Sequence, residues 1–162
     1  MKSQGHPLFC IALTVSVVFA ACSADESLPI PAPPPNDCAL ENGTVSWRSA
    51  SNDYCSNNQL YASNQGGVAI SAVTKTGVTI NLLIDNPNIG TYPMSALQNG
   101  LLYTDQLGNA WSLPNENSGT LTITSHNSST KSLKASFTCT VQNTLGTELQ
   151  ISNGVIDVTY TE

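Results

Sequence analysis

The sequence predicts an all-β protein, an antiparallel β-sandwich of about ten short strands, with barrel-like closure as the alternative. Apolar and polar residues alternate in many short stretches, most clearly at 119–141, where two alternating runs surround a tip rich in Ser and Asn. Period two indicates strands with one buried face, so these runs predict an antiparallel hairpin. No window of helical length has the apolar spacing of an amphipathic helix.

Composition supports the same fold class and argues against a nucleic-acid partner. The chain has 162 residues, enough for one domain with a substantial core. Charged residues make up only 10 %, so the Lys, Glu and Arg of typical helix surfaces are scarce. The formal net charge is −6. We therefore expect no nucleic-acid partner, because no basic patch is available to neutralise phosphates.

Residues 1–21 have the pattern of a lipoprotein signal peptide. A short positive start precedes the apolar stretch 8–21, which is too short for a transmembrane helix and typical of a signal-peptide core. The stretch ends in Val-Phe-Ala-Ala-Cys at 18–22, which resembles the lipobox of bacterial lipoproteins. We expect cleavage before Cys22 and lipidation of this residue. The alternative is ordinary secretion, with Cys22 incidental to an Ala-rich cleavage region.

Residues 22–36 are expected to form a tether. The acidic pair Asp25 and Glu26 resembles the export signal of surface lipoproteins in Bacteroidota; the alternative is a solvated linker. Five prolines follow between 29 and 35. A run of this kind favours extended polyproline conformation and could hold the domain up to ~40 Å from the lipid.

The domain proper is expected at 37–162, with turns that divide it into strands. An Asn-Gly pair at 42–43 predicts a hairpin in which Cys38 opposes Trp47, because both turn positions favour positive φ. A second pair at 153–154 predicts either another hairpin or a bulge within one longer strand. Further strands are expected at 60–63, 68–73, 78–84, 90–94, 101–104 and 110–113.

A set of short motifs in this order resembles a family of uncharacterised Bacteroidota lipoproteins. The motifs are an Asn-Gly hairpin ending in Trp, Gly-Thr-Tyr at 90–92, Ser-Gly-Thr-Leu-Thr-Ile-Thr at 118–124, Ser-Phe-Thr at 136–138 and Ile-Ser-Asn-Gly-Val at 151–155. The resemblance covers most of residues 38–160. It implies an all-β domain behind a lipid anchor and assigns no activity or site residues.

The residues that carry most enzyme chemistry are sparse. After signal cleavage His126 is the only histidine, at the predicted hairpin tip, where we interpret it as a solvated turn residue. A catalytic triad or a zinc site would need more partners than this. Carboxylates are present but fall mostly at predicted turns, where Asp serves the backbone. We expect no catalytic residues, no metal and no cofactor.

Tyr103 and Trp111 flank a short turn and are predicted to share a face of the sheet. One interpretation is a platform for a sugar ring or a partner's side chain. The other is core packing, since large aromatic side chains supply much of a small core.

Three cysteines remain once Cys10 is lost with the signal peptide and Cys22 is assigned to the lipid: Cys38, Cys55 and Cys139. In an oxidising envelope they permit one disulfide and leave one thiol. The first choice is Cys38–Cys55 and the second is Cys38–Cys139.

Together these features predict a lipid-anchored protein of the outer membrane, facing the surface or the periplasm, with a non-catalytic binding or envelope-interaction domain. The expected partners are the membrane, through the N-terminal lipid, and an unidentified protein or glycan. The alternatives are a carbohydrate-acting hydrolase that uses the scattered carboxylates, and a purely structural envelope component.

Overall fold

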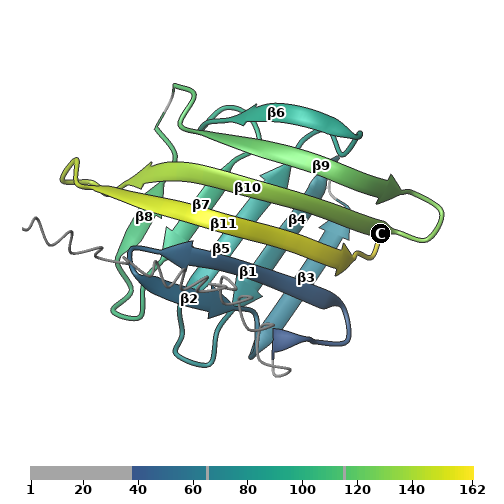
Figure 1. The fold of residues 1–162 in the computed structure, drawn as a ribbon, viewed down its shortest axis with the longest axis horizontal. Coiled ribbons are helices and arrows are strands. Elements are labelled where there is room, and N and C mark those ends of the chain that lie inside the picture. Colours follow the sequence, from purple (N-terminus) through teal and green to yellow (C-terminus); the bar gives the residue numbers. More distant parts are fainter. Residues whose placement is uncertain (1–37, 65, 115) are drawn as a thin grey trace, which may run out of the picture. The chain divides into compact units, whose positions relative to one another are not determined.

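A computed structural model describes residues 38–64, 66–114 and 116–162 (Figure 1). The predicted signal peptide, Cys22, Asp25, Glu26 and the Pro-rich tether lie outside the described residues. The described part contains eleven strands, all paired antiparallel, and the all-β class is confirmed. They are β1 (Gly43–Ser49), β2 (Asn52–Cys55), β3 (Gln59–Asn64), β4 (Val68–Val73), β5 (Thr79–Ile84), β6 (Gly90–Met94), β7 (Leu101–Thr104), β8 (Ala110–Ser112), β9 (Gly119–Asn127), β10 (Ser132–Gln142) and β11 (Glu148–Thr159).

The strands form one sheet that curls into two facing layers. In Figure 1, β6, β9, β10, β11, β1 and β2 lie side by side in front, and β3, β4, β5, β7 and β8 lie behind them. Strand β10 joins the layers, because it pairs with β9 along most of its length and with β8 at Gln142, which lies opposite Ser112. Backbone hydrogen bonds of Thr161 with Ala62 and Asn64 attach the C-terminal residues to β3. The sheet is therefore a half-barrel that combines the predicted sandwich with partial closure.

The core lies between the two layers and follows the period-two pattern of the sequence. In β10 every second side chain is buried, from Leu133 to Val141, while the residues between them are exposed or half-buried. The largest fully buried side chains come from both layers and include Trp47, Ile80, Ile84, Met94, Leu121, Ile123, Leu133, Ile151 and Ile156. Burying an aliphatic side chain of this kind stabilises a fold by about 1.5–3 kcal/mol.

The hairpin predicted around residues 42–43 is wrong beyond its turn. Leu40 and Gly43 exchange two backbone hydrogen bonds of 2.9 Å, and Gly43 has a φ of 116°. The chain before Leu40 does not continue along β1, whose neighbours are β11 and β2. Trp47 therefore lies opposite Tyr54 rather than Cys38. A disulfide to Cys55 holds Cys38 away from the expected position.

At residues 153–154 the bulge alternative is confirmed and the hairpin is wrong. Strand β11 runs through both residues, with a register shift against β1 on one side and against β10 on the other. Asn153 has a φ of 50°, which asparagine tolerates better than most residues. A β-carbon on Gly154 would lie 2.5 Å from the Phe137 ring, so the bulge lets a buried aromatic side chain pack against bare backbone.

The 119–141 hairpin is confirmed, but its strands extend further than expected. Strand β9 reaches Asn127, so His126 is a half-buried strand residue opposite Leu133. Its Nε2 atom shares a hydrogen bond of 2.6 Å with the Tyr160 hydroxyl group, and the two rings stack. The interpretation of His126 as a solvated turn residue is therefore wrong, because the C-terminal segment supplies it with a partner.

Candidate functional site

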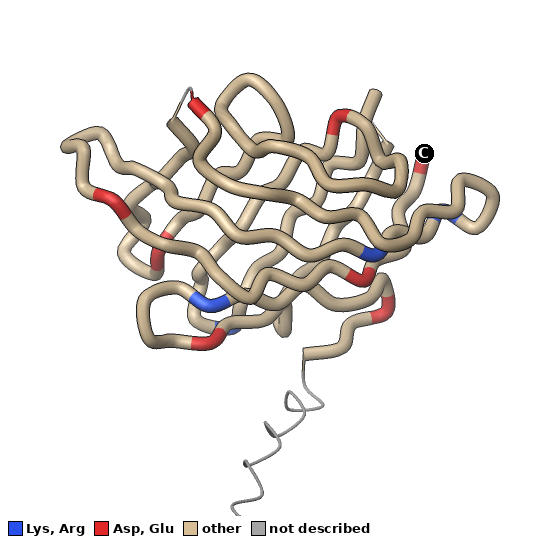
Figure 2. Tube along the Cα trace, turned by 45° about the horizontal axis from the view of Figure 1, so that its top comes forward, with Lys and Arg blue, Asp and Glu red and all other residues tan. Residues whose placement is uncertain are grey.

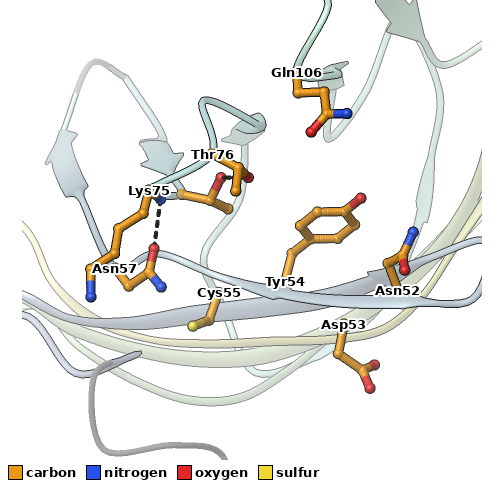
Figure 3. A pocket seen from close by; sticks show the side chains of 9 residues that line it. Asn52, Asp53, Tyr54, Cys55, Asn57, Lys75, Thr76 and Gln106 are labelled. Carbon is orange, nitrogen blue, oxygen red and sulfur yellow. Dashed lines mark hydrogen bonds between the residues drawn. The ribbon is translucent and has the colours of Figure 1, made fainter.

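An open pocket of about 470 Å³ lies beside the short strand β2 (Figure 3). Its size is within the range of small-molecule sites. Three separate segments form it: β2 with the residues just after it, the turn between β4 and β5, and the turn between β7 and β8. The lining residues are Asn52, Asp53, Tyr54, Cys55, Asn57, Thr74, Lys75, Thr76 and Gln106.

Strand β2 is a sheet edge that is fixed at its C-terminal end. It pairs with β1 alone, and only over four residues. Cys55 is bonded to Cys38 in a disulfide, the pair that the sequence analysis placed first. Directly after it, the Ser56 amide group donates to the carbonyl oxygen of Val45, and the Ser56 hydroxyl oxygen accepts from the Val45 amide group at 3.0 Å. These bonds hold one wall of the pocket in place without help from a ligand.

Tyr54 is the aromatic side chain of the pocket. It stacks on Trp47, with ring centroids 5.7 Å apart and planes inclined by 20°. Trp47 is buried, whereas Tyr54 is half-buried. Tyr54 also lies close to the buried Tyr103: burial raises the pKa of Tyr103, a hydrogen bond with Ser49 opposes this rise, and Tyr54 adds to it. Tyr54 therefore contacts one core aromatic side chain and lies near a second.

The turn between β4 and β5 contributes a polar wall. The Thr74 hydroxyl oxygen accepts from the Val78 amide group at 3.0 Å and lies 2.9 Å from the Thr76 hydroxyl oxygen. The Asn57 side-chain oxygen accepts a hydrogen bond of 2.7 Å from the Lys75 amide group, which ties this turn to the segment after β2. The wall is thus built from neutral hydroxyl and carboxamide groups, with Lys75 at its side (Figure 3).

The turn between β7 and β8 places Gln106 at the rim. The Asp105 carboxylate accepts from the amide groups of Leu107 and Asn109, both at 2.9 Å, and from the Asn109 side chain at 2.8 Å. The Asn109 side chain, together with these amide groups, lowers the pKa of Asp105. The Asp105 carboxylate therefore stabilises the turn through hydrogen bonds. The exposed carboxamide of Gln106 faces the pocket.

Among the described residues, one carboxylate lines the pocket, and it is already paired. Both oxygens of Asp53 accept hydrogen bonds of 2.7 Å from the Arg48 guanidinium group. This contact lowers the pKa of Asp53 and raises that of Arg48. In Figure 3, Asp53 projects from the side of β2 opposite to Tyr54. An ionised, paired carboxylate in this position is poorly suited to donate a proton at neutral pH.

Charge elsewhere on the described part is sparse and dispersed. Figure 2 shows the Asp and Glu positions spread over separate turns and strands, with few Lys or Arg positions between them. No three His, Cys, Asp or Glu side chains come together as a metal site among the described residues. In the same residues no helix is long and apolar enough to span a membrane.

Of the predicted aromatic pair, Tyr103 lies in the core and Trp111 packs against it. Tyr103 in β7 lies directly opposite Trp111 in β8, so the two residues share a face as expected. Tyr103 is only 3 % exposed and has no face to offer a ligand. Trp111 is half-buried against the same core and borders a second, smaller pocket with Leu113 and Pro114. The platform interpretation therefore does not hold for Tyr103.

Cys139 is a buried free thiol in β10. Burial raises its pKa to about 12. Because a nucleophilic cysteine needs a lowered pKa and access to solvent, this environment favours an inert packing role.

Sequence reasoning did not single out Tyr54. Its strand is short and lacks an alternating apolar run. The pocket residues of the other two segments, such as Thr76 and Gln106, are far from Tyr54 in the sequence. The available signal was its position directly before Cys55, one half of the first-choice disulfide.

In comparison with known families, the model of a domain of unknown function, DUF6252, matches residues 42–158. This range extends from the turn before β1 to the end of β11 and includes all three segments of the pocket. Searches of curated proteins and of solved structures gave no match.

Proposed function

We propose that this chain, which belongs to the DUF6252 family, is a lipid-anchored envelope lipoprotein whose β domain is a non-catalytic binding module. Cys22 carries the lipid, the Pro-rich segment is the tether, and the domain faces the surface of the outer membrane or the periplasm. The resemblance to Bacteroidota lipoproteins in the motif order supports this location.

The pocket beside Tyr54 is the observation that carries the binding function. Its walls are held by the Cys38–Cys55 disulfide and by hydrogen bonds within each turn, so it is organised before a ligand arrives. A preformed site loses less conformational entropy on binding than a flexible one. An aromatic ring surrounded by a few polar groups is the usual composition of a binding site.

The same pocket supports binding over hydrolysis. A glycosidase needs two carboxyl groups across a cleft, one of them able to donate a proton. Within the described part of the chain the pocket is lined by one carboxylate, Asp53, whose pKa is lowered by Arg48. Asp105, in the adjoining turn, is saturated by backbone and Asn109 hydrogen bonds. A purely structural role would not require a preformed pocket with an exposed polar rim.

Anchoring is tested by Cys22→Ala in the native host. Two or more acyl chains bury enough methylene groups, at ~0.8 kcal/mol each, to make attachment effectively permanent. The variant should lose metabolic labelling with a fatty-acid analogue and should fail to mature or leave the membrane fraction. Cys139→Ala, which removes a buried thiol far along the chain, is the matched control and should keep the label. Unchanged membrane attachment of Cys22→Ala would contradict the lipoprotein assignment.

Surface export is a separate claim and has its own test. Asp25→Ala combined with Glu26→Ala should leave lipidation intact but reduce the fraction of protein that external protease reaches on whole cells. Equal protease access in the double variant and the wild type would refute the export signal and leave the lipid anchor standing.

A further inference from the structure

We propose that the pocket beside Tyr54 binds a neutral saccharide, with one sugar ring stacked against the Tyr54 ring. This inference rests on the proposed binding function and names its ligand class. The apolar C–H face of a sugar ring suits an aromatic surface, while its hydroxyl groups need partners that both donate and accept hydrogen bonds.

Tyr54 has the properties of a rigid stacking surface. Trp47 stacks on its ring at a centroid separation of 5.7 Å, and the Tyr54 side chain also lines the pocket. Because Trp47 is itself buried between the two layers, the ring is supported from beneath. In Figure 3, Tyr54 projects into the space bordered by Thr76, Gln106 and Asn52. A ring held in this way needs little further ordering when a ligand stacks on it.

The groups around Tyr54 match the hydroxyl groups of a sugar. Asn52 and Gln106 are exposed, and each carboxamide offers one acceptor oxygen and two donor hydrogens. Thr76 adds a hydroxyl group, whose present contact is Thr74 at 2.9 Å. Asn57 uses its side-chain oxygen for the Lys75 amide group, and its amino group remains as a donor. Asn52, Thr76 and Gln106 come from three segments and border the space around the Tyr54 ring, and Asn57 lies further along the same pocket (Figure 3).

The charges at the pocket favour a neutral ligand over an ionic one. Asp53 is compensated by Arg48 through two hydrogen bonds and points away from Tyr54. Lys75 is the cation among the described lining residues, and in Figure 3 its side chain extends alongside Asn57, away from the Tyr54 ring. The space over the ring is therefore bordered by uncharged groups. The test below includes anionic sugars, whose exclusive binding would contradict a neutral ligand.

The test uses the full lipidated chain in detergent micelles and two kinds of probe. The first is a set of neutral oligosaccharides and their sulfated or carboxylated counterparts, measured by calorimetric titration. The second is the envelope fraction of the host, untreated, treated with protease, or oxidised with periodate to destroy sugar diols. The variants are Tyr54→Ala, Tyr54→Phe, Gln106→Ala and the matched control Tyr61→Ala, which removes a 61 % exposed ring from β3 outside the pocket.

We expect neutral oligosaccharides to bind and periodate to abolish binding to the envelope. Tyr54→Ala should weaken affinity by about tenfold, the upper range for a stacked aromatic pair. Tyr54→Phe keeps the ring and should stay within about threefold of the wild type, whereas Gln106→Ala should weaken affinity by about fivefold, the effect of losing one hydrogen bond. Tyr61→Ala should bind as the wild type does. Gln106→Ala keeps the test decisive if Tyr54→Ala folds poorly, because the Gln106 side chain is exposed.

Three results would overturn the inference in distinguishable ways. Binding of the anionic sugars alone, weakened by salt, would exclude a neutral ligand. Envelope binding that protease removes, and that periodate and Tyr54→Ala leave unchanged, would exclude the saccharide and keep the binding module. The absence of binding to any sugar and to the untreated envelope would overturn the proposed function and the inference with it.

Discussion

Tyr54 at the pocket and Trp47 in the core form one aromatic stack, with ring centroids 5.7 Å apart and planes inclined by 20°. The two residues lie directly opposite each other in β2 and β1. The stack links the stability of the fold to the shape of the pocket, because the side chain that lines the pocket also covers the largest buried side chain of the core.

The stack predicts a spectroscopic effect. In a Trp111→Phe background Trp47 is the only tryptophan. Tyr54→Ala should then expose one side of Trp47 to water, shift its emission to longer wavelength and cost about 1 kcal/mol beyond the loss of burial. Tyr61→Ala in the same background should leave the emission unchanged. Identical spectra for the two variants would contradict the stack.

The Cys38–Cys55 disulfide predicts redox-dependent stability. Replacing both residues with serine should lower the free energy of unfolding by about 3 kcal/mol, the chain-entropy value for a loop of this length. Dithiothreitol should lower the melting temperature of the wild type and leave that of the double variant unchanged. Non-reducing peptide mapping should recover the 38–55 pair, and a 38–139 pair would contradict the account.

The bulge in β11 predicts a size limit at Gly154. An added methyl group would lie 2.5 Å from the buried Phe137 ring, so Gly154→Ala should destabilise the fold by about 1–3 kcal/mol. Gly100→Ala is the matched control, since an added β-carbon there has no atom within 4 Å. Chemical denaturation measures both. Equal stability of the two variants would mean that β11 does not bulge against Phe137.

The Asp105 turn predicts a pH-dependent contribution. Asn109 and two backbone amide groups hold the pKa of Asp105 below its usual value, so the folded state favours the carboxylate. Its stabilising effect is present above the usual carboxyl range near about pH 4 and is lost as pH falls through the lowered pKa. Asp105→Asn should therefore melt below the wild type at neutral pH, and the difference should shrink in acid.

The control for this titration is Glu116→Gln, a change at an exposed position outside the pocket. Its melting temperature should follow that of the wild type across the same pH range. A gap between Asp105→Asn and the wild type that stays constant down to strong acid would contradict the assignment.

Local alternation was enough to predict most of the fold. The expected strands at 68–73, 90–94 and 101–104 coincide with β4, β6 and β7, because each has one apolar face that must be buried. The same signal could not find β2, whose sequence Asn-Asp-Tyr-Cys has no apolar alternation. This edge strand depends on its hairpin pairing with β1, which directly precedes it, and on the disulfide to Cys38 at a sequence separation of 17.

The pocket could not be predicted from local patterns. Tyr54, Thr76 and Gln106 lie in three segments that only the curled sheet brings together. The sequence does contain the aromatic and amide residues, but their convergence depends on which strands face each other across the half-barrel. Tyr103 illustrates the reverse case: its pairing with Trp111 was foreseeable, while its burial depended on the opposite layer.

Site-specific photo-crosslinking in living cells tests most directly whether the domain binds an envelope component through this pocket. A photoreactive amino acid at Gln106, an exposed rim position, should give an adduct of higher mass. The same group at Ser128, in the β9–β10 turn outside the pocket, should give none. An adduct at Ser128 without one at Gln106, or no adduct at either position, would contradict the account.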